Sequence, residues 1–156
     1  MRDFSRTPRQ IFLALAGTIM VAAVSGCSTT VMDLKPGDCL NLPSELDLKH
    51  GAEFSLSAVE RTECDEPHQA EVIHSFDVAT SEDEDFPGVD TLWERAQEVC
   101  TTQFENYVGS TLENSTLELM PMLPSEESWK QNADHTGLCV AYLSEGKVST
   151  TFKNFK

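Results

Sequence analysis

The first long apolar stretch of the chain covers residues 11–24, where only Thr18 interrupts it. The ten residues before it carry three arginines against the single acidic residue Asp3. As a helix, this stretch would span about 21 Å, less than the roughly 30 Å of a membrane's hydrocarbon core. A basic leader followed by a short apolar run is typical of secretory signals, so residues 1–26 are predicted to be a signal peptide.

A second pattern, with apolar residues three or four positions apart, begins near residue 90. Its members are Leu92, Ala96, Val99, Cys100, Phe104, Tyr107 and Val108. This spacing predicts an amphipathic helix with Cys100 on its apolar face. Asp90 or Thr91 is the expected N-cap, and Gly109 is expected to end the helix after Val108.

Other segments alternate between apolar and polar residues, or are short and apolar, as strands are. The predicted strands are residues 52–61, 70–78, 116–122, 137–143 and 147–152. A short helix capped by Ser125 is expected within residues 124–130. Together these elements predict an α+β fold, with one main amphipathic helix packed on an antiparallel sheet.

The residues that end the predicted signal resemble the lipobox of bacterial lipoproteins. They read Val-Ser-Gly-Cys and end at Cys27, after two small residues. In such sequences the thiol forms a thioether to diacylglycerol, and two or more acyl chains hold a protein stably on a membrane. We therefore expect Cys27 to be the lipidated N-terminus, residues 27–32 to form a short tether, and the domain to stand on the extracytoplasmic face of the cell membrane. The alternative is an ordinary secreted protein in which Cys27 is incidental.

Charge excludes one class of partner. The chain has 11 basic and 26 acidic residues, and removal of residues 1–26 leaves 8 against 25, a net charge of −17. Binding to nucleic acid requires clustered Lys and Arg, so a nucleic-acid partner is not expected. An anionic membrane surface would also repel the domain, so the lipid must hold it there.

Four cysteines remain besides Cys27, an even number that predicts two disulfides in an exported domain. Three connectivities are possible, and we favour Cys39–Cys64 with Cys100–Cys139 because sequential pairs close the shortest loops. No two of the four form a C-x-x-C pair, which argues against zinc or thioredoxin-like chemistry.

Six blocks of sequence carry a resemblance to a known family. They are 36–40 (PGDCL), 64–72 (CDEPHQAEV), 86–88 (FPG), 107–109 (YVG), 123–129 (LPSEESW) and 138–142 (LCVAY). In this order they resemble the septum formation-related domain of actinobacterial lipoproteins and single-span envelope proteins. Leu123 and Ser125 stand where that family commonly has Tyr and Thr. The resemblance assigns residues 33–156 to such a domain and implies a role in cell division, but it supplies no reaction and no catalytic residue.

Candidate chemistry centres on His68. With Glu71 or His74 it could bind a divalent metal, or it could bond a backbone carbonyl and order the start of a strand. The second role is favoured because no third ligand has suitable spacing. Trp129 is the better candidate for an exposed aromatic contact, although packing is the commoner role for such a residue.

No cofactor, metal or enzymatic activity is expected from these patterns. The acidic run at residues 82–85 lacks the spacing of a calcium loop and is expected to be a solvated, mobile loop. Two hypotheses remain: an interaction module that binds an envelope or divisome protein, and a small metal-dependent or hydrolytic enzyme with a site around His68.

Overall fold

The computed structural model describes residues 33–43 and 59–155. Five strands form one antiparallel sheet in the order β2-β1-β3-β5-β4. The strands are β1 (Cys39–Asn41), β2 (Glu60–Thr62), β3 (Ala70–Asp77), β4 (Glu118–Met122) and β5 (Thr136–Tyr142). The helices are α1 (Val89–Val108), the 3-10 helix η3 (Leu112–Asn114) and α2 (Glu126–Asn132). The predicted α+β fold is confirmed.

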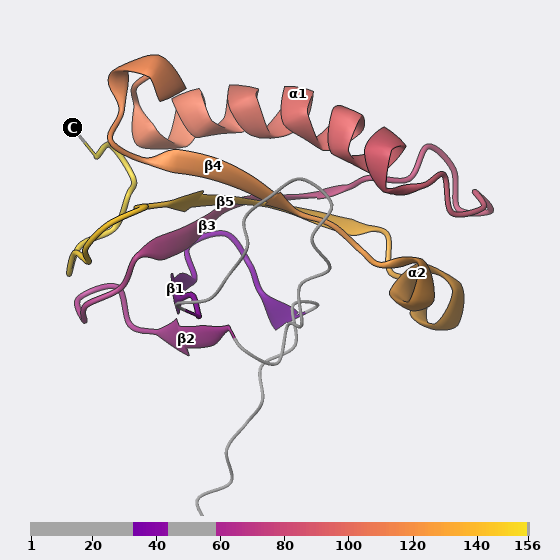
Figure 1. Ribbon diagram of the computed structural model, residues 1–156, viewed down its shortest axis with the longest axis horizontal. Coiled ribbons are helices and arrows are strands. Elements are labelled where there is room, and N and C mark those ends of the chain that lie inside the picture. Colours follow the sequence, from indigo (N-terminus) through magenta and orange to yellow (C-terminus); the bar gives the residue numbers. More distant parts are fainter. Residues whose placement is uncertain (1–32, 44–58, 156) are drawn as a thin grey trace, which may run out of the picture.

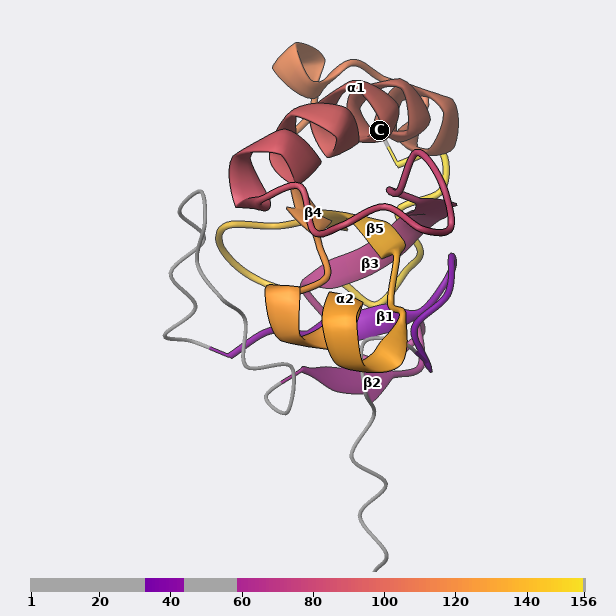
Figure 2. The ribbon, with the colours of Figure 1, turned by 90° about the vertical axis from the view of Figure 1, so that its right-hand side faces the viewer.

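Helix α1 runs across one face of the sheet, and α2 lies at one end of it (Figures 1 and 2). The long helix begins at Val89, two or three residues before the start that a cap at Asp90 or Thr91 would give, and its N-cap is Gly88, which makes no side-chain cap. The predicted cap at Asp90 or Thr91 is therefore wrong. Its C-terminus is as predicted, because Gly109 adopts a left-handed conformation (φ 81°) and its N–H donates to Glu105 O at 3.0 Å.

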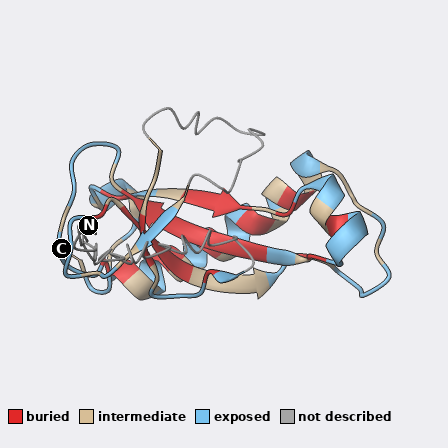
Figure 3. Ribbon diagram, turned by 90° about the horizontal axis from the view of Figure 1, so that it is seen from below, coloured by how far each residue is buried: buried red, intermediate tan, exposed pale blue. Residues whose placement is uncertain are grey.

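Two apolar layers lie on the two faces of the sheet, and Figure 3 shows the buried residues concentrated in the strands. Ile73, Phe104 and Phe152 belong to the layer beneath α1. Val72 and Val140 belong to the layer on the opposite face. Neighbouring residues of β3 thus serve opposite faces, as the alternation of a strand requires.

Two predicted strands do not correspond to a described strand along their whole length, and one described strand was not predicted. Most of the predicted strand 52–61 lies outside the described residues; its described end overlaps β2. Strand β1 was not predicted, because three residues are too few to show a period. The predicted strand 147–152 is wrong: only Val148 makes a bridge, to His68, and the backbone of Phe152 bonds a side chain instead.

Ser125 caps α2 as expected, since its hydroxyl oxygen accepts a hydrogen bond from Ser128 N at 3.1 Å. No helix among residues 33–43 and 59–155 has the length and apolar character that a membrane crossing requires.

Candidate functional site

Both disulfides have the predicted pairing. Cys39–Cys64 joins β1 to the turn that precedes β3, and its two Cα atoms lie 5.3 Å apart. Cys100–Cys139 ties the apolar face of α1 to β5 over the same Cα distance. The second bridge joins the helix to the sheet within the apolar layer beneath α1, where Cys100 and Cys139 are both fully buried.

His68 is a buried residue at the start of β3. Its Nδ1 lies 2.8 Å from Glu66 O, and its backbone exchanges two hydrogen bonds with Val148, each of 2.9 Å. Its ring packs against Phe152, with centroids 5.6 Å apart. The Nε2 atom is buried and has no hydrogen-bond partner among the described residues. These contacts match the second predicted role, in which the imidazole bonds a carbonyl and orders the strand.

Metal binding at His68 gains no support from its surroundings. Within residues 33–43 and 59–155, one group of three potential ligands is close enough to share an ion, and it consists of Cys39, Cys64 and Glu71. The two sulfurs of this group are joined in a disulfide and are not thiolate ligands. His74, the other predicted partner, is half-buried and stacks on Phe76, with centroids 6.1 Å apart.

Glu71 has a structural role that the sequence did not indicate, since it was considered only as a possible metal ligand beside His68. Its side chain is 1 % exposed and accepts three hydrogen bonds from distant parts of the chain. The donors are Tyr107 Oη at 2.5 Å, Thr151 Oγ1 at 2.8 Å and the backbone N–H of Phe152 at 2.5 Å. The carboxylate thus fastens the C-terminal segment to the sheet and to the end of α1.

The same contact changes the titration of a tyrosine. Burial, reinforced by the hydrogen bond to the Glu71 carboxylate, raises the pKa of Tyr107 to about 12. Burial and a bond to Glu118 likewise raise the pKa of Tyr142. Both hydroxyls are therefore held as donors to carboxylates and stay protonated at neutral pH.

The acidic run at residues 82–85 is fixed at one point by Glu84. Its carboxylate receives both guanidinium nitrogens of Arg95, at 3.0 and 2.7 Å, and the N–H of Thr80 at 2.7 Å. The hydrogen bonds from Arg95 and Thr80 lower the pKa of Glu84 to about 2. The prediction of a mobile loop overlooked this residue, whereas Glu82, Asp83 and Asp85 are exposed as expected.

Trp129 is buried beside this loop rather than exposed. It is 5 % exposed, its indole N–H donates to Glu84 O at 2.9 Å, and its ring meets Phe86 and His135 with centroids 5.7 and 4.3 Å apart. The exposed contact considered for Trp129 is thus wrong, and the packing role describes it. Cys27 lies outside the described residues.

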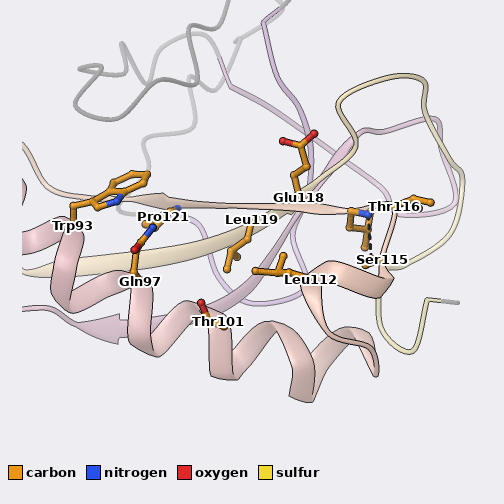
Figure 4. A pocket seen from close by; sticks show the side chains of 10 residues that line it. Trp93, Gln97, Thr101, Leu112, Ser115, Thr116, Glu118, Leu119 and Pro121 are labelled. Carbon is orange, nitrogen blue, oxygen red and sulfur yellow. Dashed lines mark hydrogen bonds between the residues drawn. The ribbon is translucent and has the colours of Figure 1, made fainter.

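A groove of about 420 Å³ lies between α1 and β4 (Figure 4). Trp93, Gln97 and Thr101, one helical turn apart, form the wall on α1. Leu119 and Pro121 of β4 belong to the opposite wall, while the Glu118 side chain points away from α1 and accepts the hydroxyl of Tyr142 at 2.6 Å. The remaining lining residues are Leu112, Ser115, Thr116 and Leu117.

Comparison with known proteins gives one match. The septum formation family model matches residues 35–153, about three quarters of the chain. The chain belongs to the septum formation family. No curated protein and no solved structure matches it.

The matched span contains every feature described above: both disulfides, the Glu71 cluster and all residues that line the groove. Membership of the septum formation family suggests a role in cell division, and the family brings no known enzymatic activity. The resemblance predicted from the six sequence blocks is thus confirmed.

Proposed function

We propose that the protein is a lipid-anchored, extracytoplasmic interaction module that acts in septum formation without catalysing a reaction. The observation that carries this proposal is the match to the septum formation family over residues 35–153. A role in division directs attention to partners at the envelope, and the fold offers a groove rather than a cluster of reactive side chains.

The anchoring part of the proposal rests on sequence and on redox chemistry. The Val-Ser-Gly-Cys motif supplies Cys27 as the acyl acceptor. Two disulfides with buried sulfurs at Cys39, Cys100 and Cys139 support folding in an oxidising compartment, because such bridges are rare in the cytosol. A short tether of residues 27–32 would keep the domain close to the membrane.

The non-catalytic part is supported by the state of the candidate residues. His68 is buried, with one ring nitrogen directed at a backbone carbonyl, and Glu71 is fully engaged by three donors. A general acid or base must reach the proton that it transfers in a bound substrate. Neither side chain lines the groove.

Anchoring is tested by metabolic labelling with a fatty acid in the native host. Wild-type protein should incorporate label, and Cys27→Ala should lose it and remain as the unprocessed precursor. Ser25→Ala is the matched control, because alanine keeps a small residue in the lipobox and should leave labelling intact. Undiminished labelling of Cys27→Ala would refute the lipid anchor.

The role in division is tested by complementation of a deletion strain. Loss of the gene should alter cell length or septum placement, and wild-type protein should restore both. Cys27→Ala should restore neither, because the unprocessed precursor lacks the lipid that is proposed to hold the domain at the outer face. Normal division in the deletion strain would contradict the proposed function.

A further inference from the structure

Within residues 33–43 and 59–155, no strand pairs with the outer side of β4, which is an open sheet edge. Backbone groups in an antiparallel pair alternate in direction, so every second residue of β5 faces β3 and the others face β4. Leu143 faces β3, because its N–H donates to Gln69 O at 2.8 Å. Tyr142 therefore faces β4, where its register partner is Glu118. By the same alternation, Leu119 and Pro121 turn their backbone groups to the outer edge.

Two features of β4 agree with this assignment. Proline lacks an N–H, and within a sheet it is tolerated at an edge where that position faces outward, as at Pro121. Leu117, on the same side as Leu119, donates its N–H to the hydroxyl of Ser115 at 3.0 Å rather than to a strand. The N–H and C=O of Leu119 have no strand partner among the elements that the structure describes. Such an edge is a template for an extended chain.

The groove lies beside this edge. The Leu119 side chain points toward α1, so a strand added next to β4 would send every second side chain the same way (Figure 4). Those side chains, about 6.6 Å apart, would lie between β4 and the helix wall of Trp93, Gln97 and Thr101. The volume of about 420 Å³ is within the usual range of ligand sites.

Charge determines which extended chain fits. Glu118 is the one charged residue among the described residues that line the groove, and the chain as a whole has 26 acidic residues against 11 basic ones. The sole basic residue of α1 is Arg95, and Glu84 binds it in a bidentate ion pair. No lysine or arginine from the described part of the chain lines the groove. A groove that has no cation among its described lining residues, on a chain with a net charge of −15, attracts a basic segment and repels an anionic polymer.

We propose that an extended, basic segment of a partner envelope protein adds to the β4 edge and places alternate side chains in the groove. Main-chain bonds to Leu119 would align the segment, and the negative charge of the domain would select its charge. This partner deepens the envelope function proposed above and rests on it. A neutral glycan is the competing occupant, and it has no strand backbone to pair with the edge.

The test uses the full-length protein in nonionic detergent and a fluorescent nine-residue peptide of alternating valine and lysine, followed by anisotropy. Thr101→Lys places a positive charge in the groove wall and should weaken binding about tenfold. Thr102→Lys is the matched control: Thr102 is exposed, does not line the groove, and bonds Glu98 O at 3.1 Å. It changes the net charge equally and should alter binding by less than about twofold.

Two further probes separate strand pairing from attraction by charge. A copy of the peptide with alternate backbone nitrogens methylated keeps its charge but loses its main-chain donors, and it should bind at least about tenfold more weakly. Chitotetraose represents the neutral glycan and should not compete with the peptide. Equal weakening by Thr101→Lys and Thr102→Lys, equal binding of the methylated copy, displacement by chitotetraose, or no peptide binding would each overturn the proposal. Because this assay does not depend on where the protein lies in the cell, it can fail while the septal role stands.

Discussion

Replacing Glu71 with leucine should release the C-terminal segment from the sheet. The buried carboxylate accepts hydrogen bonds from Tyr107 Oη, Thr151 Oγ1 and Phe152 N. Leucine is of similar size and offers no acceptor, so all three donors lose their partner. The change affects one cluster of side chains. This cluster nevertheless connects Glu71 to residues that lie 36 to 81 positions further along the chain.

The size of the loss in the free energy of unfolding depends on whether each of the three donors can form a hydrogen bond to water instead. Thr151 is exposed and Tyr107 is half-buried, so their hydroxyls can bond water. The N–H of Phe152 is buried, and a stranded donor of this kind costs about 1–3 kcal/mol. With the two weakened hydroxyl contacts, and with relief of the buried charge as an offset, the free energy of unfolding should fall by about 2–4 kcal/mol. Glu71→Gln should cost about 1 kcal/mol, because its amide oxygen can still accept from Phe152.

Urea unfolding of the full chain with its disulfides intact measures this difference, and hydrogen exchange reports the Phe152 amide directly. Glu118→Gln is the matched control, because Glu118 also accepts a tyrosine hydroxyl, that of Tyr142, but is exposed. It should change stability by less than about 1 kcal/mol. Unchanged stability of Glu71→Leu, or a Phe152 amide that stays protected in it, would refute the anchoring role of the carboxylate.

Three further predictions concern the bridges and the titrating groups. The double variant Cys100→Ala with Cys139→Ala opens a loop with a sequence separation of 39 and should lower the free energy of unfolding by about 4 kcal/mol, measured by urea titration. The pKa of Glu84 is lowered from 4.5 to about 2. Its ion pair with Arg95 therefore stabilises the fold above pH 4.5, and this contribution to the free energy of unfolding is lost as the pH falls toward 2. In Glu84→Gln, unfolding followed during acid titration should lack this pH-dependent loss of stability. The pKa of Tyr107 is raised from 10.0 to about 12, and that of Tyr142 is also raised. Both tyrosines therefore stabilise the fold below pH 10, and this contribution is lost as the pH rises through their pKa values in the folded state. Tyrosinate absorbance should stay flat through pH 10 and rise only near pH 12 or above.

Local sequence patterns predicted the helix and the strands that are long enough to show a repeated pattern of apolar residues. Helix α1 extends over 20 residues, and its apolar spacing fixed both its buried face and the position of Cys100. Strands β3 and β5 are eight and seven residues long, enough for their composition to be recognised. The disulfide pairing was predicted correctly because sequential cysteine pairs close the shortest loops. The helix and the two long strands depend on residues close together in sequence, whereas the disulfide pairing was inferred from the lengths of the loops that the bridges close.

The misjudged features depend on contacts between distant residues. Glu71 alternates with buried neighbours and looks like a solvent-facing position, until Tyr107 and Phe152 are brought to it. The bond that it makes to Phe152 also takes that backbone away from the predicted strand 147–152. Trp129 stands in a polar segment, but α2 carries it onto Phe86 and the backbone of Glu84. The groove likewise combines α1 with β4, which no local pattern relates.

The most direct test of the proposal that a lipid anchor holds the protein at the septum is the distribution of the protein in dividing cells. A fluorescent protein that folds in an oxidising compartment, fused after Lys156, allows the septal signal to be divided by the signal along the lateral membrane. The ratio should exceed that of a uniform membrane dye for the wild-type protein, and Cys27→Ala should abolish the enrichment while Ser25→Ala keeps it. A wild-type ratio equal to that of the dye, in a strain where the fusion is the only copy and division is normal, would contradict the septal function.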